Sequence, residues 1–543
     1  MTDTPVLIVG AGPVGLVLAK ELSHHGIAST IVERNLDTTR WPKMDITNCR
    51  SMELLRRLGL DTGLRQVGVP PQHSFDVVFS TGLGGREISR WNLDSVDRMQ
   101  ARIRACNDGT QPSQAWQRCS QEIFEAWMKR LCEADPLIDV QSGARVESVA
   151  QDVDSVTATI ADAGDGRGAR TLTAQYLVGC DGATSAVRKA LGIELDGGPV
   201  PRIARLVHFK SRDLAALHAH GQFWHIFFSN PSTLIAQDEV DTWTLQNYFP
   251  PDFDPSGIDP IELIHRGVGR KIEVDRVLVT SVWRGNILVA RRYRDGRIFL
   301  AGDSAHQNIP TGGYGMNTGV GDAVDIGWKL AARLKGWGGE ALLDAYETER
   351  RPVAQRNVKR SGEHAEVHTR WRSRIKPELL EAEGAAGDAH RAELSAQIRR
   401  EDNENQDLGI EIGYRYNGSP VIMHEGGAEP VWSTRTYTPS TWPGARPPSV
   451  FLDDGSNLFD QLGTGFTLLE LAGSQAGDAD AIAAAALARG VPLKRVAIDS
   501  PRVRDLYERD LVLVRPDQHV AWRGNAAPGS PLAMIDQVRG ALT

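Results

Sequence analysis

Apolar and polar positions at the start of the chain predict a strand, a helix and a second strand. The apolar run Val6–Val9 is typical of a buried parallel strand. A helical pattern follows as far as about His25, where Gly26 is the expected C-cap. The next strand pattern, 29–32, ends at Glu33. This order predicts a βαβ unit of a parallel sheet.

The middle of the chain has strand patterns. Segments from about 145 to 160 and from 172 to 178 alternate like strands around a GDGRG turn at 164–168. The stretch 201–289 is rich in strand formers and aromatic side chains. It predicts a second sheet, inserted between two parts of the first domain.

The last third of the chain predicts helices and then a separate unit. Residues 361–405 are charged and helical in pattern, so we expect them to connect domains. A new unit begins near residue 407. Its clearest elements are strands at 511–515 and 519–523, joined by a Pro-Asp turn.

Length and composition narrow the class of protein. A chain of 543 residues is long enough for roughly three to four domains. The formal charge of -8 gives no electrostatic reason to expect a nucleic acid or an anionic membrane as partner. No apolar run approaches the roughly 18 residues of a membrane span, and the first residues lack the basic region of a secretory signal. We therefore expect a cytoplasmic protein.

The cysteines show neither metal-ligand nor CxxC spacing, which favours free thiols in a reducing compartment and no metal site. They are Cys49, Cys106, Cys119, Cys132 and Cys180. Because no cysteine follows Cys180, the C-terminal unit cannot carry out thiol–disulfide chemistry.

A glycine fingerprint joins the first predicted strand to its helix. Gly10 permits a tight turn, Gly12 lets the backbone approach a pyrophosphate, and Gly15 lets helix and strand pack closely. Glu33 is placed to accept hydrogen bonds from a ribose. A lone GxGxxG is weak evidence, but here strand, turn, helix, strand and acid all occur. The fingerprint fits either NAD or FAD.

A second glycine-rich signature lies nearly 300 residues farther along. The sequence RIFLAGDSAH at 297–306 ends an apolar run at Gly302 and Asp303, and PTGGYGMNTGVGD at 310–322 leads into an amphipathic segment. Backbone N–H groups at such a helix start can stabilise negative charge. Two signatures that handle phosphate or ribose indicate one long cofactor held at both ends, which favours FAD.

This second signature resembles the GD region of single-component (group A) FAD-dependent aromatic hydroxylases, which are flavoprotein monooxygenases. The resemblance implies that Asp303 binds the ribityl chain and that the loop after it lies against the isoalloxazine ring. The loop residues concerned are Pro310, Gly313, Gly315, Met316 and Asn317. The sequence DGATSAVR resembles the family's DG motif, which implies that Asp181 and Arg188 orient the pyrophosphate region. Ser185 could alone be a helix N-cap.

Weaker matches to the same family add further cofactor contacts. Gln117 falls where members place a flavin-contacting glutamine, although their glutamate four residues later is Gln121 here. Lys43 falls where relatives often carry a phosphate-facing arginine. It keeps the charge without the bidentate fork, and it could equally be a solvated loop charge. Arg34 and Val146 complete the contacts that the resemblance implies.

The resemblance also implies the reaction. NADPH or NADH would reduce FAD, O2 would add to give a flavin C4a-hydroperoxide, and an electron-rich ring would attack its distal oxygen. This sequence has no second GxGxxG after a strand, which two-Rossmann flavoenzymes such as Baeyer–Villiger monooxygenases or disulfide reductases would show. That favours the hydroxylase class, in which NAD(P)H binds transiently in a cleft.

Asp45 is the candidate base beside a phenol hydroxyl. Phenol hydroxylase resembles this stretch and has its catalytic aspartate at the same offset before Arg50, while the 2-hydroxybiphenyl and 2,4-dichlorophenol hydroxylases have histidine there. A carboxylate of pKa about 3.9 is a poor base for a phenol near 10, so either burial raises its pKa or the proton is transferred as charge leaves the ring. The alternative is an aspartate that makes a loop hydrogen bond.

Loose alignment with the biphenyl-type hydroxylases suggests a substrate pocket on the inserted sheet. Its side chains would be Trp224, Ile235, Gln237 and Trp283, with Pro310 from the loop. Each sheet residue could equally belong to the core. His225 and His306 have no partner pattern, which predicts packing or surface roles.

The predicted fold class is α/β (α+β): a Rossmann-like FAD-binding domain with an inserted substrate-binding sheet and a C-terminal thioredoxin-like domain. The last resembles the unit attached to phenol hydroxylase and to natural-product hydroxylases, and it could stabilise the protein or form a homodimer. The expected boundaries are 1–73, 114–190 and 290–362 for the FAD-binding domain, 74–113 and 191–289 for the substrate sheet, 363–406 for a helical linker and 407–543 for the thioredoxin-like domain.

The cofactor motifs leave other functions open. A polyketide-tailoring oxygenase, hydroxylating a large aromatic or performing Baeyer–Villiger insertion, would share every motif. A flavin-bound regulatory module without turnover is the alternative outside enzymes. The partners expected of the enzyme are a small aromatic substrate, O2 and NAD(P)H.

Overall fold

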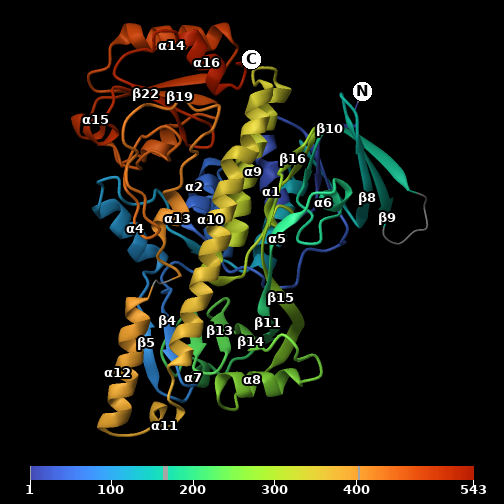
Figure 1. The fold of residues 1–543 in the computed structure, drawn as a ribbon, viewed down its shortest axis with the longest axis vertical. Helices are drawn as coiled ribbons and strands as arrows, with labels where there is room; N and C mark the ends of the chain where they lie inside the picture. The colour runs from blue at the N-terminus through green and yellow to red at the C-terminus, as the bar shows by residue number, and fades with distance from the viewer. Residues whose placement is uncertain (1, 163–168, 402–403, 543) are drawn as a thin grey trace.

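The computed structural model describes residues 2–162, 169–401 and 404–542, and the GDGRG turn expected at 164–168 lies outside them. Figure 1 shows three regions stacked along the long axis: a central body with α1 and α9, a sheet region below it and a C-terminal unit above it. None of the described helices combines the length and apolar character needed to cross a membrane.

The first sheet lies in the central body. Its main path runs β16-β17-β10-β1-β2-β7; off this path, β9 pairs with β10 and β8 pairs with β9. The strands are β1 (Thr4–Val9), β2 (Ser29–Glu33), β7 (Ile138–Ser142), β8 (Ala144–Gln151), β9 (Val156–Asp162), β10 (Arg170–Gly179), β16 (Arg294–Asp295) and β17 (Ile298–Leu300). β1 pairs in parallel with β2 and β10, and β10 in parallel with β17, so these strands end at one edge. With α1 (Pro13–His24) between β1 and β2, the predicted βαβ unit is confirmed.

Helix α9 (Tyr314–Leu334) packs closely on α1 because small residues face it. A Cβ added at Gly319 would lie 2.4 Å from Val14 Cγ2, and one added at Gly327 would lie 2.4 Å from Glu21 Cγ. The helix interface therefore brings the start of α9 next to the glycine fingerprint.

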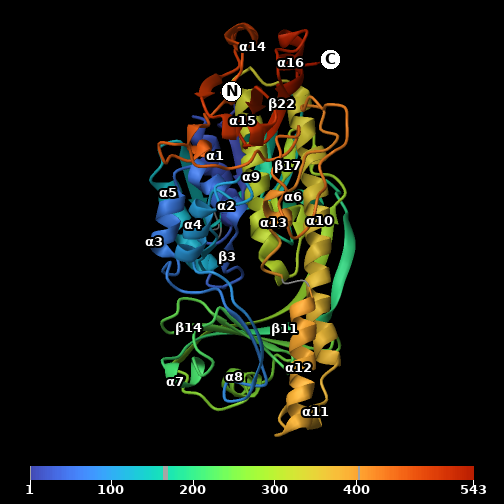
Figure 2. The ribbon, with the colours of Figure 1, turned by 90° about the vertical axis from the view of Figure 1, so that its left-hand side faces the viewer.

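The second sheet crosses beneath the central body, with α7 (Leu214–Leu217) and α8 (Pro260–Val268) on its far side (Figure 2). Its order is β18-β15-β11-β14-β13-β12-β4-β5. The strands are β4 (Val77–Ser80), β5 (Glu87–Trp91), β11 (Leu195–Lys210), β12 (His225–Phe228), β13 (Ser232–Ala236), β14 (Thr242–Phe249), β15 (Arg276–Ala290) and β18 (His306–Gln307). Because β18 belongs to the GD region, the second sheet is hydrogen-bonded directly to it.

The long helix α10 (Glu340–Ser373) runs from the central body down to the second sheet (Figure 1). It starts well before residue 363, so the linker is the end of this helix followed by α11 (Pro377–Leu380) and α12 (Ala385–Arg400). Helix α12 packs beside β5, where the hydroxyl groups of Ser395 and Ser89 are 3.1 Å apart.

The C-terminal unit has the strand order β20-β19-β21-β22. Its elements in chain order are β19 (Phe466–Leu471), α14 (Ala476–Ala488), β20 (Leu493–Ile498), α15 (Pro501–Tyr507), β21 (Leu511–Val514), β22 (Val520–Gly524) and α16 (Pro531–Val538). β19 pairs in parallel with β20 and antiparallel with β21, the thioredoxin-like arrangement. The predicted strand pair is confirmed as β21 and β22. Before this sheet, residues 407–457 form α13 (Leu408–Ile412) and irregular chain.

Candidate active site

The turn after β1 has the geometry of a pyrophosphate cradle. Gly10 has φ +107°, and a Cβ there would lie 2.5 Å from the carbonyl oxygen of Cys180. A Cβ at Gly15 would lie 2.0 Å from the carbonyl oxygen of Gly10. At Gly12, by contrast, no protein atom lies within 4 Å of an added Cβ, so the space beside it is open. Helix α1 begins at this open space without a side-chain cap, as an anion-binding helix end should.

Glu33 lies beside this turn at the end of β2. Its Oε2 accepts a hydrogen bond from Ala11 N at 2.8 Å, and its Oε1 accepts one from Asn35 N at 2.8 Å. Arg34 is exposed next to it, whereas the side chain of Val146 is buried in the core of the first sheet. The structure therefore brings Glu33 to the turn and keeps the Val146 side chain inside the sheet.

The GD signature meets the fingerprint in space. Gly302 and Asp303 form the 3₁₀ turn η1 (Gly302–Ser304) after β17, and a Cβ at Gly302 would lie 2.8 Å from Val14 Cγ2 in the first turn of α1. Asp303 accepts no hydrogen bond from the described residues, and its side chain is open to solvent. The surrounding protein nevertheless desolvates it enough to raise its pKa, against the charges of His306 and Lys43. An accessible carboxylate in a protein-lined recess suits a ribityl hydroxyl group.

The DG motif forms the start of α6 (Ala186–Ala190). Asp181 Oδ2 accepts hydrogen bonds from Ala186 N at 2.7 Å and Val187 N at 3.1 Å, while its buried Oδ1 has no partner within the described chain. Ser185 is the N-cap, with Oγ accepting from Arg188 N at 2.9 Å. Arg188 Nη1 donates to Ser304 O at 3.0 Å, so the DG motif holds η1 in place.

Both polar atoms of the Gln117 side-chain amide form hydrogen bonds within the protein. Its Nε2 donates to Val69 O and Arg118 O, each at 2.9 Å, and its Oε1 accepts from Arg65 at 3.2 Å. The amide therefore positions the short strand β6 (Gln117–Arg118), and a flavin contact by this side chain stays a prediction. Lys43 is exposed, in a position where its charge acts on Asp303.

The glycine-rich loop and the start of α9 contact the segment that follows Asp45. Gly312 and Gly313 have φ +83° and +64°, and a Cβ at Gly313 would lie 2.5 Å from Ile46 Cγ2. Asn317 Nδ2 donates to Ile46 O at 3.1 Å, and Asn317 Oδ1 accepts from Asn48 N at 2.9 Å. These bonds fix β3 (Ile46–Thr47), directly after Asp45, against the loop.

Asp45 is hydrogen-bonded to the second sheet. Its Oδ2 accepts from Trp224 Nε1 at 2.9 Å and lies 3.1 Å from His225 Nε2. Burial by itself would raise the pKa of Asp45, but the hydrogen bonds and charge of His225, the Trp224 bond and the charge of Arg118 outweigh it and lower the pKa. A raised pKa, one of the two routes expected for Asp45, is therefore wrong, and proton transfer as charge leaves the ring stays a prediction.

The expectation that the two histidines lack partners is also wrong. His225 pairs with Asp45, and His306 Nε2 lies 2.8 Å from Asp322 Oδ2, with both side chains fully buried. Asp322 also accepts from Arg350 Nε at 2.8 Å. The His306 pair therefore ties β18 to α9. A carboxylate 16 residues ahead gave no sequence signal, because only the fold brings it to the histidine.

A cavity of about 550 Å³, counting its open mouth, lies between the second sheet, the loop and α10. Neighbouring strands supply aromatic side chains, the loop supplies Ile309–Thr311, and α10 closes the side with His368 and Arg372. Of the predicted pocket residues, Trp283 and Pro310 line this cavity. Trp224, Ile235 and Gln237 are buried and do not line it, and Gln237 Nε2 donates to Thr244 Oγ1 at 3.1 Å. A substrate contact by any of them stays a prediction.

Several lining residues were missed from the sequence. Phe227 and Tyr248 come from β12 and β14, and Phe227 follows His225 by two residues, so strand alternation could have placed both on one face. His368 and Arg372 lie on a helix whose charged pattern indicated only a connector. No local signal placed that helix beside the sheet.

These residues fit FAD at both ends. The open space at Gly12 and the uncapped helix suit the pyrophosphate, Glu33 is at hand for a ribose, and Asp303 offers an accessible carboxylate. The two glycine signatures meet where Gly302 packs against Val14, as a cofactor held at both ends requires.

Comparison with known proteins agrees with this site. Residues 3–361 match the family model "FAD binding domain", and residues 440–543 match "Aromatic-ring hydroxylase, C-terminal". The chain is 42% identical to the FAD-dependent monooxygenase apdD of Emericella nidulans, over 96% of this chain and 87% of that protein. It is 31% identical to a putative polyketide hydroxylase of Streptomyces halstedii (96% and 93%) and 29% identical to a phenol 2-monooxygenase of Pseudomonas sp. (99% and 96%).

A solved structure supports the same assignment. The flavin-dependent monooxygenase PieE, in complex with FAD and substrate, superimposes with a TM-score of 0.90 at 29% identity, covering 100% of each chain. The predicted family and fold class are confirmed. This chain belongs to the FAD-dependent monooxygenases that carry an aromatic-ring hydroxylase C-terminal domain.

Proposed function

We propose that this protein hydroxylates a phenolic or other electron-rich aromatic compound, with NADPH or NADH as electron donor and O2 as oxidant. The observation that supports this most directly is the aromatic-lined cavity, which the glycine-rich loop borders through Ile309, Pro310 and Thr311. Bound FAD would supply the electron transfer and oxygen activation. The protein's own side chains would orient the ring and exclude water.

Asp45 would hold the substrate hydroxyl group. Its Oδ2 is occupied by Trp224 and His225, whereas Oδ1 accepts no hydrogen bond from the described residues. Because its pKa is lowered, Asp45 is an anion at neutral pH and a weak base. It would therefore accept a hydrogen bond from the phenol and take the proton only as charge leaves the ring.

Asp45→Asn is expected to lower product formation about 100-fold or more, because the amide cannot accept this proton. Reduction of FAD by NAD(P)H without substrate should stay unchanged. The measurement is hydroxylated product per NAD(P)H consumed, with hydrogen peroxide quantified in parallel. Asp37→Asn, at an exposed position in the same segment, is the matched control. Wild-type product yield in Asp45→Asn would remove Asp45 from the proposal.

The proposed function is tested with a panel of phenols and polycyclic aromatics under ¹⁸O2, offering NADPH and NADH separately. The expected result is stimulated NAD(P)H oxidation and a product that contains one labelled oxygen atom. If every compound yields only hydrogen peroxide, hydroxylation of this substrate class is refuted. Flavin that NAD(P)H never bleaches without oxygen would instead point to a flavin-bound module without turnover.

The cavity also favours a second candidate, a polyketide-tailoring oxygenase. Three aromatic side chains from separate strands line it, Phe227, Tyr248 and Trp283, which suits a ring system larger than a single phenol. In the same panel, polycyclic compounds should then compete effectively against phenol. Product NMR distinguishes the reactions, since hydroxylation adds a ring hydroxyl and Baeyer–Villiger insertion converts a ketone to an ester.

A further inference from the structure

The cavity has an unbalanced positive charge. Two of its lining side chains are arginines, Arg202 on β11 and Arg372 on α10, and no described lining residue is acidic. Both arginines are partly exposed, and within the described chain neither guanidinium forms an ion pair with a carboxylate, as Arg118, Arg350, Arg446 and Arg515 do. Arginines of a pocket that lack a carboxylate partner are open to an anionic ligand.

Arg372 is held in place but not neutralised. Its Nε donates to Phe228 O at 3.1 Å, and its buried Nη2 donates to none of the described residues. Burial lowers the pKa of Arg372 to about 10, although Tyr248 and Glu404 favour its charged form. A fixed guanidinium with an unused buried N–H group costs free energy unless a ligand supplies the acceptor.

Arg202 faces the same space from the sheet. Its Nη2 donates to Thr369 Oγ1 at 3.2 Å, and its guanidinium lies 5.8 Å from the centre of the Tyr248 ring. Burial raises the pKa of Tyr248 to about 12, so this phenol is neutral and gives no countercharge.

The nearby carboxylate, Glu404, is already engaged. Its Oε1 lies 3.2 Å from His368 Nε2, and its Oε2 accepts from Gly312 N at 3.2 Å. Burial lowers the pKa of His368 despite Glu404, so this imidazole is neutral at neutral pH. Two guanidinium groups against one carboxylate leave this end of the cavity with a net positive charge.

We propose that this cavity recognises an aromatic substrate through an anionic oxygen group, a carboxylate or an acidic enol, bound by Arg372 and Arg202. The aromatic part would lie against Trp283 and Phe227. This inference rests on the proposed function, because it assigns the substrate class of the same site.

The test measures binding to the oxidised, FAD-loaded protein by calorimetry, without NAD(P)H. The probes are 1-hydroxy-2-naphthoic acid and its methyl ester, which differ in the charge of one group. Wild-type protein should bind the acid about 10- to 100-fold more tightly than the ester. Arg372→Gln and Arg202→Gln should each reduce that preference by about tenfold, while Arg372→Lys keeps part of it. Arg374→Gln, exposed two residues along the helix, should leave it unchanged.

FAD content and melting temperature check that each variant is folded. If one of the two glutamine variants does not fold, the other still tests the inference. Equal affinities for acid and ester, or no binding of the acid up to its solubility limit, would overturn the inference. A preference for the acid over the ester that is unchanged in both glutamine variants would also overturn the inference. Tight, arginine-dependent binding of the acid, with only hydrogen peroxide from every compound of the turnover panel, would instead refute the proposed function, so the two failures are distinguishable.

Discussion

Gly12→Ala is expected to give a folded protein with weakened FAD binding. Its φ of -74° is open to alanine, and an added methyl group meets no protein atom within 4 Å, so the apoprotein should keep its melting temperature. The same methyl group would occupy the space of the pyrophosphate. Overpacking of this kind costs about 1–3 kcal/mol, or roughly 5- to 150-fold in FAD affinity. Titration of apoprotein with FAD, followed by flavin fluorescence, measures the loss.

Two other glycines serve as controls. Gly477→Ala in α14 also meets no atom within 4 Å but lies far from the cofactor in sequence and fold, so it should change neither property. Gly15→Ala would place its methyl 2.0 Å from Gly10 O, so it should disrupt the turn and the fold of the apoprotein. Unchanged FAD affinity in Gly12→Ala would show that the pyrophosphate does not lie at this turn.

Arg515→Met is expected to destabilise the protein by about 3–5 kcal/mol. Arg515 joins the C-terminal unit to α9 and α10, with donor–acceptor distances of 2.6 Å to Glu349 and 3.1 Å to Asp325. Lys329 donates to the same carboxylates from the other side, and the whole cluster is buried. Methionine would fill much of the volume and leave the carboxylates short of positive charge. Urea unfolding followed by circular dichroism measures the effect.

The matched control is Arg495→Met on β20. This arginine pairs with Glu470 at 2.7 Å but is exposed, so its loss should cost about 1 kcal/mol or less. Equal effects of the two substitutions would contradict a structural role for the buried cluster.

The effect of Arg515→Met should depend on pH. Burial opposes ionisation of Glu349, but the charges of Arg515 and Lys329 outweigh it and lower its pKa from 4.5 to about 2. A carboxyl group whose folded pKa is lowered adds stability above its unfolded pKa and loses that stability as the pH falls toward the folded value. The difference between wild type and Arg515→Met is therefore expected to be full at neutral pH and to shrink as the pH falls from about 4.5 to about 2.

The cofactor site could be predicted from the sequence because backbone groups at a glycine-rich turn form much of it, and glycine spacing shows where such a turn lies. Gly10, Gly12 and Gly15 have local steric roles that the turn alone requires, and Asp303 follows a buried strand whose end is fixed by parallel pairing. The first βαβ unit and the last strand pair followed for the same reason, since strand and helix periods are local properties.

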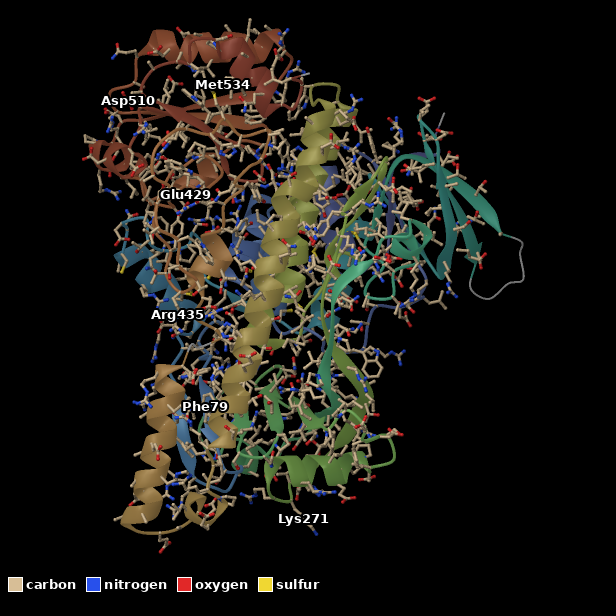
Figure 3. The ribbon with its side chains drawn as sticks, in the orientation of Figure 1. Phe79, Lys271, Glu429, Arg435, Asp510 and Met534 are labelled. Carbon is tan, nitrogen blue, oxygen red and sulfur yellow. The ribbon has the colours of Figure 1, made fainter. Side chains whose placement is uncertain are left out.

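The substrate site could not be predicted, because its side chains converge from distant elements. Asp45 receives hydrogen bonds from Trp224 and His225, which reverse the direction expected for its pKa. Trp224 is buried in the core and does not line the cavity. Arg372 lines it from a helix whose sequence predicted only a linker. Figure 3 shows Phe79 in the lower sheet region close to α10, where its ring contacts Trp371.

The sequence by itself determined the FAD-binding frame, the parallel sheet around it and the cysteine-free C-terminal unit, since glycine spacing and hydrophobic period are set by neighbours along the chain. Only the tertiary structure decided the charge of Asp45, the lining of the cavity and the buried cluster around Arg515. Those properties depend on which charges and rings lie within a few ångströms of one another, and burial strengthens the electrostatic part of each such contact.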